Sequence, residues 1–223
     1  MNLATAREKL EITALGVITL VIILNSAFFA SLSLNRHQAW QWVTDDLFLV
    51  GLVYIGFLVF SIFCILLHKN KLIKNLFFVV LSLMTLHIFY NLVNLLTDPS
   101  INQQGQVILL DAFIIWTSTM LTFSLWYWIL DRGGPLARSL SPLLTRRERH
   151  DFHFAQYGLQ ETGWHHWQPR FIDYVSLSFF VATNFSAADV IPLSKPAKIL
   201  VMIEAGTSLV IIAMVITRAI SLL

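Results

Sequence analysis

Six long apolar stretches, separated by polar loops, constrain the fold of this chain more than any other feature of its sequence. Because an α-helix rises 1.5 Å per residue, about 20 apolar residues cover the roughly 30 Å hydrocarbon core of a bilayer. Charged residues make up 13% of the chain, about half the share found in soluble domains. The stretches cover residues 11–34, 47–67, 73–96, 106–130, 171–188 and 197–222. They predict an all-α, polytopic integral membrane helical bundle with about six transmembrane helices.

The apolar stretches divide the chain into three regions. Residues 1–130 are predicted to form a four-helix transmembrane region, and residues 131–170 a basic, aromatic juxtamembrane loop. Residues 171–223 form a third region, a helix, a polar turn and a second helix. The first of these helices is short and polar-ended, which leaves open whether it crosses the membrane or re-enters one face.

The juxtamembrane loop begins with Gly133, Gly134 and Pro135, which predict the end of the fourth helix. Its arginines stand beside apolar residues that include Phe152 and Phe154, a pattern typical of a segment lying on an anionic lipid surface. The arginines proposed to bind lipid are Arg146, Arg147 and Arg149. The histidines of the loop have no cysteine partners and no regular ligand spacing, so no metal site is predicted.

The most specific pattern in the chain lies within residues 173–220. A short apolar helix is followed by a polar turn that begins at Thr183, then by Asp189 and Pro192, and then by a long apolar helix that contains Gly206. This order resembles the pore helix, selectivity filter and inner helix of the two-transmembrane potassium-channel family. The resemblance implies a pore-loop module, a monovalent cation as the transported species and a homotetramer. Gly206 would be a hinge or packing glycine.

The filter of that family is altered in this chain. A filter that resembles T-x-G-x-G depends on glycines, because they let successive carbonyl groups point into the pore. Ser186 and Ala188 stand at the two glycine positions, so a potassium-selective carbonyl ladder is not expected. The residues across the filter, in chain order, are Thr183, Asn184, Phe185, Ser186, Ala187, Ala188 and Asp189. Side-chain oxygens among them are candidates for a polar constriction.

The distribution of Lys and Arg predicts the orientation, because cytoplasmic loops retain positive charge. With six full crossings and the N-terminus inside, 12 of the 15 Lys and Arg residues face the cytoplasm, and Arg36, Lys195 and Lys198 face outward. A pore loop that enters from outside, as in the channel family, would instead place 13 of these 15 residues outside. The charge rule therefore favours six crossings with both termini in the cytoplasm, in a membrane of the bacterial inner type.

Polar side chains inside the bilayer are costly and mark candidate functional sites. Five of them are predicted at similar depths in the outer half of the bundle: Glu204, Asp111, His87, Asn91 and Asn94. Together, two carboxylates and a titratable imidazole would form a cation or proton pathway. The alternative is a buried hydrogen-bond network between helices, which is common in membrane bundles.

The sequence contains no nucleophile elbow, zinc-protease motif, phosphate-binding loop, dinucleotide fingerprint or CxxC pair, so neither enzymatic activity nor a cofactor is predicted. The basic loops account for the pI of about 8.8, so no nucleic-acid partner is expected. The expected function is a weakly selective or non-selective cation channel, with the lipid bilayer as partner and a small homo-oligomer as assembly. The alternatives are a non-conducting scaffold or accessory subunit, and a small proton-coupled transporter.

Overall fold

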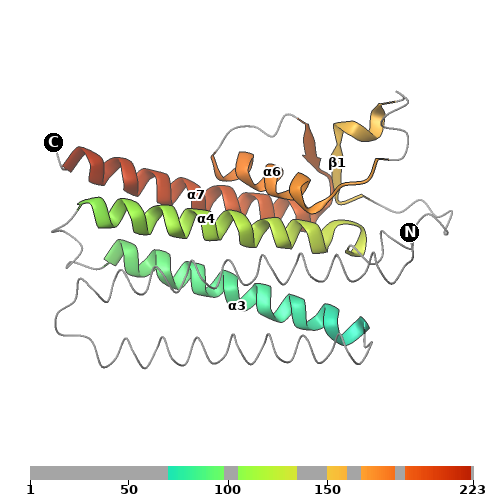
Figure 1. Ribbon diagram of the computed structural model, residues 1–223, viewed down its shortest axis with the longest axis horizontal. Helices are drawn as coiled ribbons and strands as arrows, with labels where there is room; N and C mark the ends of the chain where they lie inside the picture. The colour runs from blue at the N-terminus through green and yellow to red at the C-terminus, as the bar shows by residue number, and fades with distance from the viewer. Residues whose placement is uncertain (1–69, 98–104, 135–149, 160–166, 184–188, 222–223) are drawn as a thin grey trace. The chain divides into compact units, whose positions relative to one another are not determined.

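The computed structural model of the chain describes residues 70–97, 105–134, 150–159, 167–183 and 189–221 (Figure 1). Its elements, in chain order, are α3 (Asn70–Thr97), α4 (Gly105–Leu130), η2 (Asp131–Gly133), β1 (Phe152–Phe154), η4 (Ala155–Gly158), α6 (Phe171–Ala182), β2 (Val190–Pro192) and α7 (Lys195–Ser221). The predicted helical character is confirmed, with helices at three of the predicted stretches, 73–96, 106–130 and 197–222. The predicted spans 11–34 and 47–67 lie outside the described residues.

Among the described residues, two helices are long and apolar enough to cross a membrane, Leu109–Gly133 and Lys195–Thr217. Phe77–Val93 in α3 and the whole of α6 are apolar but shorter. The exposed side of α3 carries large apolar residues such as Leu86 (65% exposed) and Val93 (54% exposed), while Leu81 and Ile88 are buried on its other side. A helix that is apolar on both sides suits lipid better than water, so the described helices support a membrane location.

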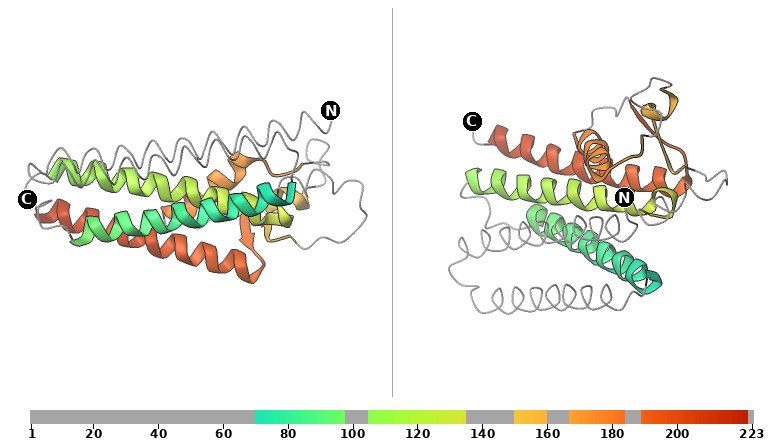
Figure 2. Two further views of the ribbon diagram at one scale, coloured as in Figure 1. Left: turned by 90° about the horizontal axis from the view of Figure 1, so that it is seen from below. Right: turned by 45° about the vertical axis from the view of Figure 1, so that its right-hand side comes forward.

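The chain divides into two compact units, and α4 and α7 each contribute to both. Within the described residues, the first unit holds 119–134, 150–159, 167–183 and 189–212. The second holds 70–97, 105–118 and 213–221. In the first unit α7 lies beside α4 and runs antiparallel to it, as the right-hand view of Figure 2 shows.

Helix α4 ends at Leu130, where the backbone turns to left-handed conformations. Arg132, Gly133 and Gly134 have φ angles of 50°, 75° and 102°. Glycine adopts such angles without steric cost. At Gly134 a Cβ would also lie 3.3 Å from the carbonyl oxygen of Ile129. The predicted role of the two glycines in ending the fourth helix is therefore confirmed.

β1 and β2 form a two-stranded antiparallel sheet that the sequence analysis did not predict. Phe152 pairs with Pro192, and Phe154 pairs with Val190. The pairing extends at both ends, because the Ala155 N–H donates to the Asp189 carbonyl oxygen at 2.8 Å and the Leu193 N–H donates to the Asp151 carbonyl oxygen at 2.8 Å. The chain that follows α6 is thereby tied to the chain that precedes it.

Side chains of β1 and α6 pack into an aromatic cluster in the first unit. Phe152 and Phe154 are buried, at 0% and 1% exposed. The ring of Phe152 lies 5.1 Å from that of Tyr127, and the ring of Phe154 lies 5.4 Å from that of Tyr174. The expectation that these two phenylalanines lie on the lipid surface is wrong, because the β pairing turns both of them inward.

The α6–β2 segment begins and ends near the same point, the C-terminal end of α4. The Tyr174 hydroxyl, in the first turn of α6, donates to the Asp131 carboxyl at 2.6 Å. The same carboxyl accepts the Phe152 N–H at 3.3 Å, and Phe152 is paired with β2. With 12 residues α6 is about 18 Å long, too short for a hydrocarbon core of roughly 30 Å. The described structure does not contain a crossing helix over 171–188, and whether this stretch crosses or re-enters stays a prediction.

Candidate functional site: a buried carboxyl between three helices

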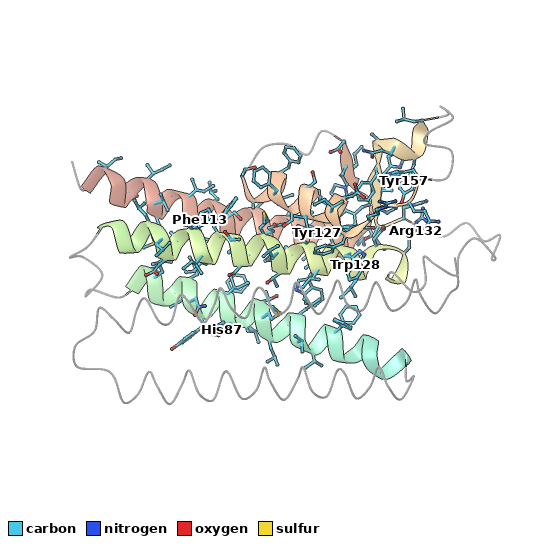
Figure 3. The ribbon with its side chains drawn as sticks, in the orientation of Figure 1. His87, Phe113, Tyr127, Trp128, Arg132 and Tyr157 are labelled. Atoms are coloured by element: carbon cyan, nitrogen blue, oxygen red, sulfur yellow. The ribbon has the colours of Figure 1, made fainter. Side chains whose placement is uncertain are left out.

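The carboxyl group of Glu204 lies where α4, α6 and α7 of the first unit meet. Glu204 is 0% exposed, and both of its carboxyl oxygens have partners. The Tyr127 hydroxyl of α4 donates to Oε2, and Oε1 forms a hydrogen bond with the Ser178 hydroxyl of α6. Tyr127 is labelled in Figure 3, on the part of α4 that precedes η2. One side chain of α7 is thereby joined to both neighbouring helices.

Ser178 connects this carboxyl to the backbone of α4. It is 0% exposed, and its Oγ also lies 2.7 Å from the Met120 carbonyl oxygen. That carbonyl accepts the Ser124 hydroxyl as well, at 2.7 Å. The site is therefore a continuous row of hydroxyl, carboxyl, hydroxyl and carbonyl groups that crosses from α4 through α7 and α6 and back to α4.

The site lies deep along the helices. Glu204 comes nine residues after Lys195, the first residue of α7, which corresponds to about 14 Å along the helix axis. Met120 precedes Asp131 by 11 residues, which corresponds to about 16 Å. Half of a 30 Å hydrocarbon core is about 15 Å, so both distances are about half the length that a membrane-spanning helix needs.

Tyr127 and Ser178 account for the polar contacts of the Glu204 carboxyl, and no Lys, Arg or His of the described residues pairs with it. An ionised carboxylate that is buried without a cation costs several kcal/mol. The hydrogen bonds and burial of Glu204 therefore fit a neutral carboxylic acid better than an anion.

A second buried carboxyl, that of Asp131, organises the end of α4. It is 0% exposed and accepts the Tyr174 hydroxyl at 2.6 Å. It also accepts the N–H groups of Asp151 and Phe152, at 3.1 and 3.3 Å. The Asp151 carboxyl in turn accepts the N–H of Arg132 at 3.1 Å. Asp131 thus fixes α6 and β1 to α4, a role that sequence reasoning missed because the residue begins a polar loop.

Arg132 anchors the outer part of this network. Its Nε donates to Nδ1 of His150 at 2.9 Å, and its guanidinium carbon lies 5.1 Å from the centre of the Tyr157 ring. Figure 3 shows Arg132 and Tyr157 close together at one end of the first unit. A guanidinium above a tyrosine ring is a favourable cation–π contact. The segment that follows the predicted lipid-binding arginines is therefore packed onto the protein.

The other residues of the predicted polar pathway belong to the second unit. Asn91 and Asp111 are both 0% exposed, and the His87 ring lies 6.4 Å from the Tyr90 ring. The side chain of Asn94 is not among those described. Because Glu204 alone of the five belongs to the first unit, a single pathway through all of them stays a prediction.

The filter-like turn is described only at its two ends. The Thr183 hydroxyl donates to the Phe179 carbonyl oxygen of its own helix at 2.8 Å, and Asp189 is exposed. The residues between them, 184–188, lie outside the described part of the chain, as do Arg146, Arg147 and Arg149. Gly206 is exposed, and no described atom lies within 4 Å of a Cβ built on it. The described structure therefore gives no close helix contact that would explain this glycine.

No protein-family model, no curated protein and no solved structure matches the chain. The resemblance to potassium channels therefore rests on residues 173–220 of the sequence, and stays a prediction.

Proposed function

We propose that this protein conducts small cations across a membrane through a pore-loop module built from α6, the filter-like turn and α7. The observation that supports the proposal is that α6 and β2 are both held at the C-terminal end of α4, α6 through Tyr174 and β2 through its pairing with Phe152. Backbone that is not helical is tolerated at membrane depth where it is buried in protein or lines a water-filled cavity. A helix that ends half-way across a membrane is therefore best explained by a cavity at its end.

The partial negative charge at the C-terminal end of α6 favours cations. The last carbonyl groups of a helix lack helical partners and form the negative end of its dipole. α6 ends at Ala182, about one turn beyond Ser178, and Ser178 bonds to Glu204. The carbonyl end of α6 attracts a cation and repels an anion, and the neighbouring carboxyl group adds no positive charge that would oppose this.

The returning segment also changes the proposed topology of the chain. If α6 does not cross, five crossings remain, so that Lys195 and Lys198 join the basic side and Arg218 leaves it. That side then holds 13 of the 15 Lys and Arg residues, a stronger asymmetry than six crossings give. By the charge rule this side is cytoplasmic. The pore loop accordingly enters from the cytoplasm, and the C-terminus lies outside rather than in the cytoplasm.

Cysteine labelling tests this topology. Gln168 precedes α6 and Lys195 begins α7, and both side chains are exposed. In a Cys64→Ala background, we expect Gln168→Cys and Lys195→Cys both to resist a membrane-impermeant thiol reagent in intact cells and both to react after lysis. Reaction of one cysteine and protection of the other would mean that the segment between them crosses the membrane. Reaction of both in intact cells would mean that the loop enters from outside.

Flux through the purified protein tests the function. Proteoliposomes that contain the wild type are expected to dissipate K⁺ or proton gradients, and Glu204→Gln is expected to change the rate several-fold, because it replaces the acid at the end of the pore helix. Met202→Leu is the matched control, since Met202 is 72% exposed on the same helix. If the wild type moves neither ion, the chain is the non-conducting scaffold or accessory subunit instead.

A further inference from the structure

We infer that Glu204 is a proton-binding site whose bound proton fastens α6 to α4 and α7. This inference concerns the folded state itself, so it holds whether or not the protein conducts ions. It is carried by the hydrogen-bond partners of one hydroxyl group, that of Ser178.

The Ser178 hydroxyl has a single hydrogen and two neighbours that ordinarily accept. One neighbour is the Met120 carbonyl oxygen at 2.7 Å, and the other is Oε1 of Glu204. One hydrogen points along a strong, linear bond to only one of the two acceptors, and a backbone carbonyl has no hydrogen to give. The carboxyl group must therefore supply the second hydrogen, so that Oε1–H of a neutral acid donates to the Ser178 oxygen.

With that proton present, each hydrogen in the row has one acceptor. The Tyr127 hydroxyl donates to Oε2, Oε1–H donates to the Ser178 oxygen, and the Ser178 hydroxyl donates to the Met120 carbonyl. Without the proton, Ser178 faces two acceptors with one hydrogen, and a negative charge is left at mid-membrane depth. The proton is therefore part of the joint between the three helices.

No positively charged group bonds to the Glu204 carboxyl among the described residues, so a proton is what neutralises it. Among the described residues, α4 offers Tyr127, α6 offers Ser178, and neither carries a positive charge. The buried carboxyl group that directly follows α4, that of Asp131, is bonded to Tyr174 and to backbone N–H groups. Because the folded state holds the proton, loss of the proton weakens the folded state.

Infrared spectroscopy of the purified protein in lipid tests the site. The difference spectrum of wild type minus Glu204→Gln is expected to contain the C=O band of one neutral carboxylic acid, shifted in D₂O. Ser178→Ala should move this band, because it removes the acceptor of the acid hydrogen. Asp111→Asn, which removes another buried carboxyl group, should leave the Glu204 band in place.

Two further measurements keep the inference testable if Glu204→Gln fails to fold. Labelling all glutamates of the wild type with ¹³C at the side-chain carboxyl should shift the neutral-acid band. As the pH is raised, the Tm of the wild type should fall in parallel with the loss of that band. If the wild-type spectrum contains glutamate carboxylate bands and no neutral-acid band, Glu204 is ionised and the inference is wrong. A band that Ser178→Ala leaves unmoved would contradict the assigned direction of the hydrogen bonds.

Discussion

Replacement of Asp131 by Ala is expected to lower the free energy of unfolding by about 3–5 kcal/mol. The carboxyl group accepts the Tyr174 hydroxyl and the N–H groups of Asp151 and Phe152, and it is fully buried. Its removal leaves buried donors without an acceptor, and each unsatisfied group costs roughly 1–3 kcal/mol. It also removes the hydrogen bonds that attach the first turn of α6 and the start of β1 to the end of α4.

Thermal unfolding in detergent micelles, followed by circular dichroism, measures this effect. Tyr174→Phe removes one of these hydrogen bonds and should cost about 1–2 kcal/mol. Asp189→Ala is the matched control, because this aspartate is exposed in the same unit and should change stability by less than about 0.5 kcal/mol. A loss below about 1 kcal/mol for Asp131→Ala would show that water replaces the carboxyl group. The hydrogen bonds of Asp131 would then not be what holds α6 and β1 at the end of α4.

The helices of the described region could be predicted because their signals are local. A long apolar stretch predicts a helix whatever surrounds it, and paired glycines end one, as they do after α4. Glu204 could be singled out for the same reason, since a carboxyl within an apolar helix is costly wherever it faces. Its partners Tyr127 and Ser178 could not be identified from the sequence. α6 contains Ser176 and Ser178, and only packing shows that the first is exposed and the second buried.

The attachment of α6 and β2 to the end of α4 could not be predicted from the sequence, because distant contacts determine it. The 18 residues from 171 to 188 are nearly long enough to span, and helix length was the available criterion. In the structure α6 ends at Ala182, and β2 pairs with β1. Each of these two strands has three residues. Strands this short, in segments 35 residues apart, leave no periodic pattern in the sequence. Asp131, which bonds to Tyr174 of α6 and to the backbone of β1, has no local signal either.

Phe152→Ala is expected to lower the free energy of unfolding by about 3–5 kcal/mol, the usual loss when a buried phenylalanine is removed from a core. Its side chain is 0% exposed, and its ring lies 5.1 Å from the Tyr127 ring and 6.4 Å from the Tyr174 ring. His153→Ala is the matched control, since His153 follows on the same strand and points to the exposed side. The Tm of Phe152→Leu should lie between those of Phe152→Ala and His153→Ala.

The same substitution connects the β pairing to the buried acid. Tyr127 both packs against Phe152 and donates to Glu204. A cavity beside its ring should let the hydroxyl move, so Phe152→Ala should broaden the infrared band assigned to the Glu204 acid while His153→Ala leaves it sharp. If Phe152→Ala lowers the Tm and the band is unchanged, the aromatic cluster stabilises the unit without positioning Tyr127. A cluster that positions Tyr127 would make the state of the buried acid depend on the packing of β1.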